Sequence, residues 1–241
     1  IVIIFHMKYH QLSRLFVKNN LRDNIIILSN LTDIHYLVKV MRKRLKDHVL
    51  LFNGTDGEYL CEITNINPKE ISFKPLKQMN TPKLEKEINL IFAPIKHNRM
   101  QFLLEKTTEL GVTKFTPIIT KHSVIDKINT DKWNIYIKDA IEQCRRLSLP
   151  PIAPLTALKD LLTNWPHNEK IYLCNENEKS LSFATINKDY PTNIMIGPEG
   201  GFSETELELL KSYNFITSVH LGENILRTET AAISAVALSS L

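Results

Sequence analysis

From residue 88 onward, short apolar runs alternate with segments in which apolar residues recur every three or four positions. Ile88–Ala93 is an apolar run that indicates a buried strand. Met100, Leu103 and Leu104 then follow at helical spacing, and Gly111 is placed to end that helix. Strands that alternate with helices favour an α/β fold with a mostly parallel sheet. This alternation constrains the fold more than any other feature of the chain.

The alternation continues to the C-terminus. Further strands are predicted at Lys114–Ile119, Lys170–Cys174, Asn193–Ile196 and Ser218–Leu221. Further helices are predicted at Asp131–Leu147, at Thr156–Trp165, from the capping box at Ser203 to Tyr213, and at Thr228–Leu241. Parallel sheets bind ligands at the carboxyl ends of their strands. The loops after Cys174, Ile196 and Leu221 are therefore the places where we expect a site.

Residues 1–80 have another pattern, in which short β-branched and apolar runs are separated by turn signals. The predicted strands are Ile25–Leu28, Val49–Phe52, Tyr59–Thr64 and Glu70–Phe73. A helix is predicted from His35 to Met41, with Thr32 or Asp33 as its N-cap. These elements predict a small β-barrel with one helix. The polar stretch from Gln78 to Lys83 contains a proline, and we expect it to link this domain to a second domain at residues 84–241.

The charge of the chain is concentrated in the predicted barrel. Residues 1–80 carry 12 Lys or Arg and 7 Asp or Glu, a net charge of +5, whereas the rest of the chain has a net charge of −1. This asymmetry favours contact with a polyanion, and a solvated basic face is an equally good interpretation.

Cysteine content and hydropathy limit the classes of protein to which this chain can belong. The three cysteines, Cys61, Cys144 and Cys174, are far apart, which excludes a disulfide scaffold and favours the reducing cytoplasm. No apolar run is long enough to cross a membrane. Residues 1–6 lack the basic start of a secretory signal, and Met7 looks a more natural start, so we interpret them as extra sequence.

Several common ligand motifs are absent from the sequence. It contains no G-x-G-x-x-G, no G-x-x-x-x-G-K-[ST], no H-E-x-x-H and no C-x-x-C. These absences weigh against a dinucleotide fold, a P-loop NTPase and a zinc enzyme, and we expect no metal.

The turn after the strand at Asn193–Ile196 is rich in glycine. Three of the seven glycines, Gly197, Gly200 and Gly201, lie within the six residues from Ile196 to Gly201. Glycine lets a ligand approach the backbone closely, and Pro198 stiffens the turn. A ligand-binding turn and a tight strand-to-helix turn without a ligand both fit this pattern.

A second loop runs from Leu221 into the last predicted helix. Its apolar residues offer walls for a flat ring, while Arg227 and Glu229 flank the helix start. A carboxylate is favoured at a helix N-terminus, so Glu229 also has a structural explanation, with Arg227 as its ion-pair partner.

These two segments together resemble the SPOUT methyltransferases, and more narrowly the uridine-N3 methyltransferases of 16S ribosomal RNA (the RsmE type). The likeness extends from about Tyr9 to the C-terminus. It includes Lys96, Arg99–Met100, Lys106 and Glu109–Val112 in the second region, Glu142–Cys144, Arg146 and Pro150 after it, and Ser13–Val17, His35 and Val40–Arg42 in the first.

The resemblance implies a PUA-like β-barrel at residues 1–80 and a SPOUT-type parallel sheet with a C-terminal trefoil knot. It also implies a cytoplasmic homodimer, S-adenosylmethionine (SAM) as cofactor, S-adenosylhomocysteine (SAH) as product, and a uridine in 16S rRNA of the small ribosomal subunit as target. The cofactor would be held by three loops, with Leu173, Ile196, Gly197, Pro198, Glu199, Gly200, Leu221, Gly222, Ile225, Leu226, Arg227 and Thr228.

Methylation of uridine N3 requires loss of a proton and stabilisation of an anionic ring. Arg14 is the first candidate for stabilising that charge and Arg227 the second, and binding to phosphate is the alternative for Arg14. Glu199 or Glu229 would accept the proton, unless solvent does. The expected contacts to RNA are Arg14, Arg42, Lys96, Arg99 and Arg146.

Two other functions remain open at this stage. One is another SPOUT enzyme, such as a ribose 2′-O-methyltransferase acting on transfer RNA. The other is a non-catalytic RNA-binding factor for ribosome assembly.

Overall fold

The computed structural model describes residues 12–175, 180–186, 188 and 190–240. Residues 1–6, which we interpret as extra sequence, lie outside this part. The chain divides into two compact units. The first unit extends to Leu84 and also includes the segment Ile141–Leu149, and the second unit consists of Glu85–Ala140 and Pro150–Leu241. The segment Ile141–Leu149 follows the predicted linker in the sequence, so its place in the first unit is a tertiary feature that the sequence pattern misses.

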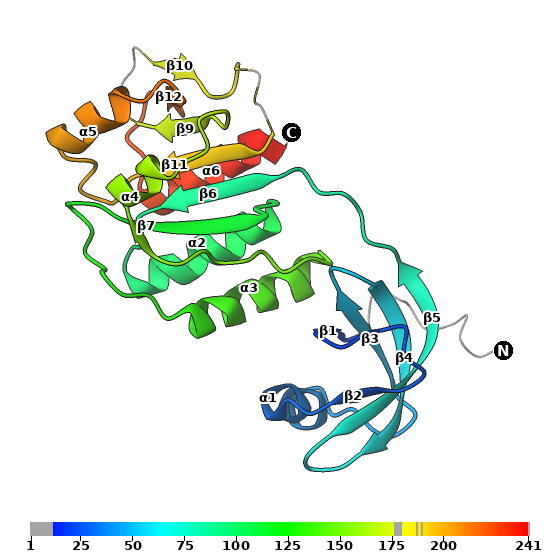
Figure 1. Ribbon diagram of the computed structural model, residues 1–241. Helices are drawn as coiled ribbons and strands as arrows, with labels where there is room; N and C mark the ends of the chain where they lie inside the picture. The colour runs from blue at the N-terminus through cyan, green and yellow to red at the C-terminus, as the bar shows by residue number, and fades with distance from the viewer. Residues whose placement is uncertain (1–11, 176–179, 187, 189, 241) are drawn as a thin grey trace. The chain divides into compact units, whose positions relative to one another are not determined.

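A curled five-stranded sheet forms the first unit, in the order β1-β3-β4-β5-β2 (Figure 1). The strands are β1 (Arg14–Phe16), β2 (Ile26–Leu28), β3 (His48–Asn53), β4 (Gly57–Ile66) and β5 (Ile71–Asn80). All neighbours pair antiparallel except β1 and β3, which are parallel. β1 is absent from the prediction because a three-residue strand carries too little periodicity. β5 runs through Gln78, where we predicted the start of a linker.

The predicted helix of this unit is two short elements, α1 (Leu31–His35) and the π-helix η3 (Tyr36–Val40). Its N-cap is Asn30, whose side-chain oxygen accepts from the backbone N–H groups of Thr32 and Asp33. The prediction of Thr32 or Asp33 as N-cap was therefore wrong by two or three residues. Asn30 is as good a cap as either, and only the backbone geometry selects it.

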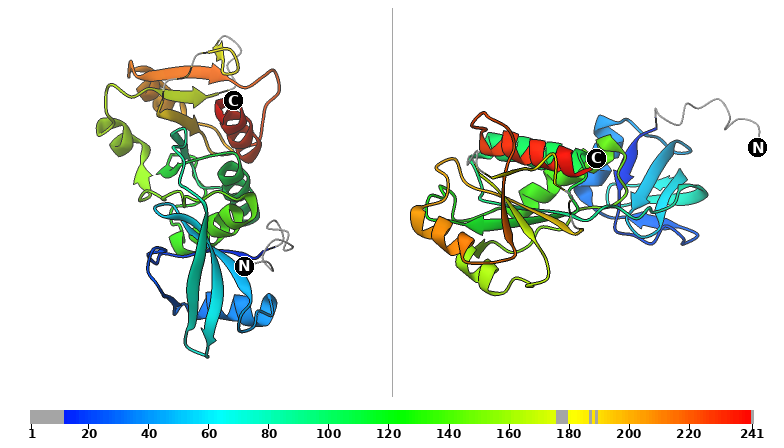
Figure 2. Two further views of the ribbon diagram at one scale, coloured as in Figure 1. Left: turned by 90° about the vertical axis from the view of Figure 1, so that its right-hand side faces the viewer. Right: turned by 90° about the horizontal axis from the view of Figure 1, so that it is seen from above.

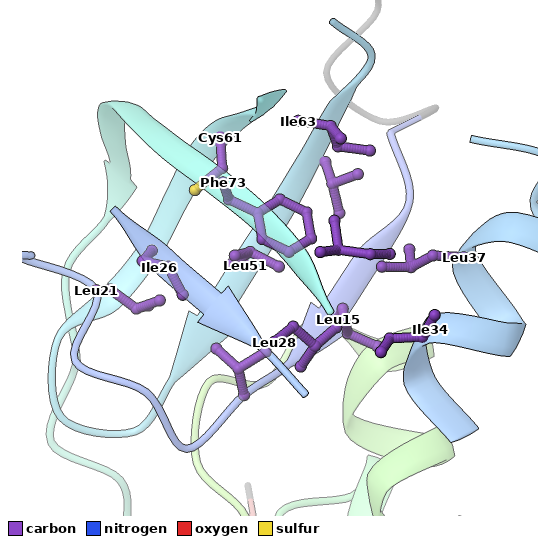
Figure 3. Close-up of a cluster of buried hydrophobic side chains, with 13 residues drawn as sticks. Leu15, Leu21, Ile26, Leu28, Ile34, Leu37, Leu51, Cys61, Ile63 and Phe73 are labelled. Atoms are coloured by element: carbon purple, nitrogen blue, oxygen red, sulfur yellow. The ribbon is translucent and has the colours of Figure 1, made fainter. Parts of the chain in front are cut away.

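The core of the first unit lies between the curled sheet and α1 (Figure 3). Phe73 of β5 lies among aliphatic side chains from the other strands and from Leu37 of η3. Cys61 belongs to this core, and its burial raises the pKa of the thiol to about 12, so it behaves as a small apolar side chain.

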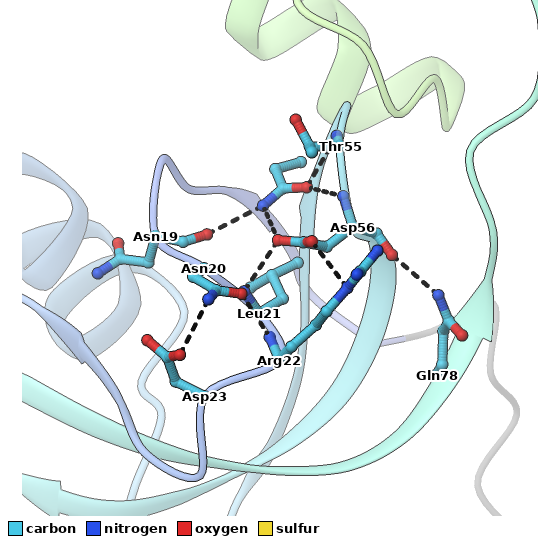
Figure 4. Close-up of polar contacts among 9 residues, drawn as sticks. Asn19, Asn20, Leu21, Arg22, Asp23, Thr55, Asp56 and Gln78 are labelled. Atoms are coloured by element: carbon cyan, nitrogen blue, oxygen red, sulfur yellow. Dashed lines mark hydrogen bonds and ion pairs between the residues drawn. The ribbon is translucent and has the colours of Figure 1, made fainter.

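The turn between β3 and β4 is held by the buried carboxylate of Asp56 (Figure 4). It accepts from the Asn53 side-chain amide at 3.0 Å and from the Leu21 backbone N–H at 3.1 Å, and it pairs with Arg22 at 3.0 Å. These contacts, the bond from Asn53 foremost, lower the pKa of Asp56 against the effect of burial. The Asn53–Gly54 pair is one of the turn signals between the predicted strands of this unit, and this network holds the turn in place.

A seven-stranded sheet forms the second unit, and every pairing in it is parallel. The strand order is β10-β12-β9-β11-β6-β7-β8. The strands are β6 (Ile88–Phe92), β7 (Lys114–Ile119), β8 (Thr156–Ala157), β9 (Ile171–Cys174), β10 (Leu181–Ser182), β11 (Thr192–Ile196) and β12 (Ile216–His220). The predicted α/β fold with a mostly parallel sheet is confirmed.

Helices cover both faces of this sheet (Figure 2). On one face α2 (His97–Glu109) packs against α6 (Thr228–Ser240), and on the other lie α4 (Leu158–Thr163) and α5 (Glu204–Lys211). The indole of Trp133 in α3 (Thr130–Cys144) lies 5.8 Å from the Phe92 ring at the end of β6. In the described part of the chain, no helix is long and apolar enough to cross a membrane.

Two helix predictions in this unit have a bound that the tertiary structure changes. The helix predicted at Asp131–Leu147 ends at Cys144, because Arg145 has a left-handed backbone with φ +67°. The first two residues of the helix predicted at Thr156–Trp165 instead form β8, which pairs with Ile118 and Ile119 of β7. Pairing at a sheet edge thus overrides the local helical pattern. The predicted stop at Gly111 is confirmed, with φ +109°.

Gly57 and Gly111 show two different reasons why a position requires glycine, backbone conformation and lack of space for a side chain. Both have positive φ, but an added Cβ at Gly57 would lie 2.2 Å from the Asn80 carbonyl oxygen, whereas no atom lies within 4 Å at Gly111. We expect Gly111→Ala to reduce the free energy of unfolding by about 1–2 kcal/mol through backbone strain. Gly57→Ala should cost about 2 kcal/mol more, because steric overlap adds to the strain. Urea unfolding of both variants tests this, and equal losses would contradict it.

Candidate active site

The carboxyl ends of the central strands lie in one row across the sheet. In the parallel register Val219 of β12 pairs with Cys174 of β9, Cys174 with Ile196 of β11, and Ile196 with Phe92 of β6. The loops that follow these strands therefore start from one edge. The candidate loops after Ile196 and Leu221 are thus brought together by the register, as we predicted from the parallel sheet.

The glycine-rich turn after β11 is held in one conformation by its neighbours. The Gly201 backbone N–H donates to the Pro198 carbonyl at 2.9 Å, and Gly201 has φ +67°. The Thr228 hydroxyl donates to the Gly197 carbonyl at 3.2 Å and so joins this turn to the start of α6. A Cβ at Gly197 would lie 2.9 Å from the Phe202 ring, so a side chain there would have to displace that ring. Gly197, Pro198 and Thr228 were all predicted as cofactor contacts, and the structure brings them together.

A loop after β7 supports the same turn from the other side. Nδ1 of His122 lies 3.1 Å from the carbonyl oxygens of both Gly200 and Gly201, and as the N–H form it donates to them. The Lys121 backbone N–H donates to the Glu206 carboxylate at 2.7 Å. Neither residue was predicted for the site, because their contacts join segments about 80 positions apart and leave no local pattern in the sequence.

Glu206 also closes the predicted capping box at the start of α5. Its carboxylate accepts from the Ser203 backbone N–H at 2.8 Å, and the Ser203 hydroxyl caps the Glu206 N–H. Burial raises the pKa of this carboxyl, but the hydrogen bonds from Ser203 and Lys121 outweigh that effect and lower it. The carboxylate therefore stays charged and continues to hold both loops at neutral pH.

Arg99 links two acidic side chains at this edge. Arg99 lies in the first turn of α2, and its guanidinium is 3.7 Å from Glu199 in the glycine-rich turn and 3.7 Å from Glu229 in α6. The Glu229 side chain is 10% exposed, whereas that of Glu199 is 29% exposed. The ion-pair partner of Glu229 is thus Arg99, not Arg227 as the structural alternative had it. Arg227 is exposed, and its guanidinium has no ion-pair partner among the described residues.

The loop from Leu221 to Arg227 combines apolar side chains with free backbone groups. Ile225 is 75% exposed, and Leu221 and Leu226 are half-buried. Gly222 has φ +139° and no atom within 4 Å of an added Cβ. In the described part of the chain, no backbone N–H of residues 222–227 donates to a protein carbonyl. Leu173 differs from the other predicted contacts, because its side chain packs in the core with Ile91 and Met195.

Arg14 is held in a buried network of polar contacts. It belongs to the first unit, where it is 8% exposed and pairs with the buried Glu58 at 2.5 Å. Its Nη1 and Nη2 groups donate to the carbonyl oxygens of Ile141, Glu142 and Arg146 at 2.8–3.0 Å. The guanidinium also stacks 3.9 Å from the Phe52 ring centroid. Four hydrogen bonds from the guanidinium stay inside its own unit, so we expect Arg14 to have a structural role in place of the predicted contact with a uracil ring or a phosphate.

The other predicted RNA contacts are divided between the units. Lys96 is exposed directly before α2, in the same unit as Arg99. Arg42 and Arg146 belong to the first unit, where Arg42 is exposed with φ +52° and the half-buried Arg146 donates to the Ser148 hydroxyl. Within the described ranges, no group of His, Cys, Asp and Glu side chains could hold a metal ion.

Comparisons with known proteins show the class of protein to which this chain belongs. Residues 82–240 match the family model of the RNA methyltransferase domain, and residues 28–76 match that of the RNA methyltransferase PUA domain. The chain is similar to ribosomal RNA small subunit methyltransferase E of Rickettsia conorii, with 36% identity over 96% of this chain and 95% of that protein. The same-named protein of Buchnera aphidicola (subsp. Schizaphis graminum) is 32% identical, over 94% of both chains.

Two solved structures extend the likeness to three dimensions. Ribosomal RNA small subunit methyltransferase E from Neisseria gonorrhoeae, bound to SAM, has a TM-score of 0.83 and 26% identity, over 94% of this chain and 95% of that one. A protein from Legionella pneumophila in complex with SAM has a TM-score of 0.83 and 28% identity, over 95% and 96% of the two chains. The fold and the matches define an RNA methyltransferase. Within that class, the chain belongs to the ribosomal RNA small subunit methyltransferase E family.

The structural role of Arg14 is testable against a second arginine of the same unit. Arg14→Ala removes the cationic partner of Glu58, whose side chain is 2% exposed, and we expect a loss of about 3–5 kcal/mol in the free energy of unfolding. Arg22→Ala removes an ion pair whose arginine is 67% exposed and should cost less than about 1 kcal/mol. Urea unfolding measures both, and a loss from Arg14→Ala no larger than that from Arg22→Ala would contradict this assignment.

Proposed function

We propose that this protein transfers a methyl group from SAM to N3 of one uridine in 16S rRNA. Membership of the family supports methylation of small-subunit rRNA, and the SAM complexes of two relatives support the cofactor. The observation that carries the proposal is the meeting of the glycine-rich turn, the Leu221–Arg227 loop and the Arg99 cluster at one sheet edge.

The residues at this edge fit the cofactor. Open space lies where side chains would begin at Gly201 and Gly222, so a ligand can approach the backbone there. The N–H groups of residues 222–227, which donate to no carbonyl oxygen of the described residues, lie in the same loop as the apolar Leu221, Ile225 and Leu226. Apolar walls with backbone hydrogen-bonding groups suit a flat heteroaromatic ring, such as adenine. When bound, SAM supplies an electrophilic methyl group on a sulfonium centre.

The chain itself must align and stabilise the uracil ring. N3 lies between two carbonyl groups, and the negative charge that forms on its deprotonation spreads onto their oxygens. Arg227 is exposed at the start of α6 and has no ion-pair partner among the described residues, so its donors are available to those oxygens. Alignment of N3 with the methyl group supplies the other large part of the rate enhancement.

A proton acceptor is needed near N3. Glu199 is the more accessible of the two carboxylates beside Arg99 and is our first candidate, with the more buried Glu229 second. Solvent is the alternative acceptor. Because N3 is on the Watson–Crick edge, the target uridine must be unpaired or flipped out of its stack.

Contacts with RNA come from cationic side chains outside the buried core. We retain Lys96, Arg99, Arg42 and Arg146 as candidates and omit Arg14. Of these, Arg99 is already paired with two carboxylates, so Lys96 is the better candidate on the second unit.

We also propose that the enzyme is a cytoplasmic homodimer that acts on the small ribosomal subunit, and that its C-terminal region forms a trefoil knot. One feature supports the dimer. Helix α6 is apolar on both sides, with Ala235 and Val236 buried and with Ile233 and Leu238 only half-buried in the single chain. Such an outer face fits a second copy of the chain.

The position of the methyl group distinguishes the remaining functions. Small subunits that lack the modification should gain one methyl group on incubation with the protein and SAM. Its nucleoside should co-migrate with 3-methyluridine and stop reverse transcription, because N3 is needed for pairing. A ribose 2′-O-methyl product would protect the RNA from alkali at that site and refute the N3 assignment. SAM binding without methylation would favour an assembly factor.

Replacement of Arg227 tests its role at the reacting ring. We expect Arg227→Ala to lower kcat about 100-fold, because one stabilising donor is lost, and to change the Kd for SAM less than about threefold. Arg227→Lys keeps the charge and should restore part of the rate. Steady-state kinetics and calorimetry measure the two quantities. An equal loss in both would reassign Arg227 to cofactor binding.

A further inference from the structure

The charges of the Arg99 cluster do not balance. One guanidinium lies 3.7 Å from each of two carboxylates, those of Glu199 and Glu229, so the cluster has one negative charge in excess. The adjoining loop carries Glu223 and Arg227, which offset each other. Lys96 and His122 on neighbouring loops are exposed, and solvent and salt screen their fields.

Glu229 provides independent evidence that a ligand completes the cluster. The residue is 8% exposed, and its Oε2 atom is buried without a hydrogen-bond partner among the described residues. An unpaired buried carboxylate oxygen is strongly unfavourable. The other oxygen of Glu229 is shared with an arginine that also serves Glu199, so the protein supplies less than one positive charge to each acid. A cationic ligand would correct this deficit.

Resting on the function proposed above, we propose that this excess negative charge makes the site select the sulfonium form of the cofactor over its thioether product. In the reaction the methyl carbon leaves sulfur and bonds to uridine N3, and the electron pair of the broken bond stays on sulfur. The N3 proton passes to solvent, either directly or through Glu199 or Glu229, which then releases it. Once the proton has left, the cluster has its original charges while sulfur has changed from positive to neutral, so the product loses an attraction that the substrate has.

The size of the effect follows from the surroundings. Glu199 is partly exposed, so its interaction with a ligand charge is weakened by water, whereas that of Glu229 is weakened less. We expect loss of either carboxylate charge to reduce the preference for SAM over SAH about five- to tenfold. The affinity for SAH, which has no charge on sulfur, should change less than about twofold.

Calorimetric titration of the full chain with three ligands tests this without any turnover. The ligands are SAM, SAH and sinefungin, which carries an amine cation in place of the methylated sulfonium. The wild-type protein should bind SAM and sinefungin more tightly than SAH. Glu199→Gln and Glu229→Gln should each weaken the two cationic ligands and leave SAH nearly unchanged.

Glu87→Gln is the matched control. It makes the same change in net charge, but Glu87 is exposed directly before β6, at the opposite end of the strand from the cluster. Its ratio of affinities should equal that of the wild type. Thermal melting of each variant checks folding, and if the buried Glu229→Gln does not fold, the more exposed Glu199→Gln carries the test.

The outcomes separate this inference from the proposed function. If the wild type binds SAM and SAH equally, or if both variants keep the wild-type ratio, charge selection is refuted while the cofactor site stands. If the wild type binds none of the three ligands, the proposed function fails and the inference fails with it. If SAH weakens as much as SAM in both variants, the two acids shape the site and do not select charge.

Discussion

The parallel register of β12, β9, β11 and β6 is the constraint on which the rest of the site depends. It aligns Val219, Cys174, Ile196 and Phe92 in one row, so that four chain segments leave the sheet at one edge. A parallel strand pair needs a crossover between its members, and here the helices that make the crossovers also cover the faces of the sheet. Residues as distant in sequence as Arg99 and Glu229 meet because each follows a strand of this row.

Rigidity at this edge comes from contacts between loops more than from any one loop. Thr228 holds the Gly197 carbonyl, His122 approaches those of Gly200 and Gly201, and Glu206 holds the Lys121 backbone. Each loop therefore limits the movement of another, and the glycine-rich turn is shaped before a ligand arrives. Preorganisation of this kind places groups for a displacement that depends on alignment.

The two units differ in how completely their ionic side chains are paired. In the first, Arg14 and Glu58 form a buried one-to-one ion pair, and three further hydrogen bonds from the guanidinium reach carbonyl oxygens. In the second, Arg99 serves two acids and neutralises neither completely. Buried ion pairs whose polar groups all have partners within the protein help to fix the fold. An ionic group that lacks a full partner can gain interaction free energy when a ligand supplies one. This contrast, more than residue type, separates the structural arginine from the arginine of the candidate site.

The sequence by itself determined the fold class and the loops to examine. The alternation after Ile88, the stop at Gly111 and the capping box at Ser203 are local signals, because hydrophobic periodicity, positive φ and capping act over a few residues. It also marked most residues of the edge, among them Gly197, Glu199, Thr228 and Glu229. Only the tertiary structure decided what each residue contacts: the burial of Arg14, the placement of Ile141–Leu149 in the first unit, the support from His122 and the sharing of Arg99 by two acids. These are contacts between distant segments, and their formation depends on strand register and packing, which no short window of sequence contains.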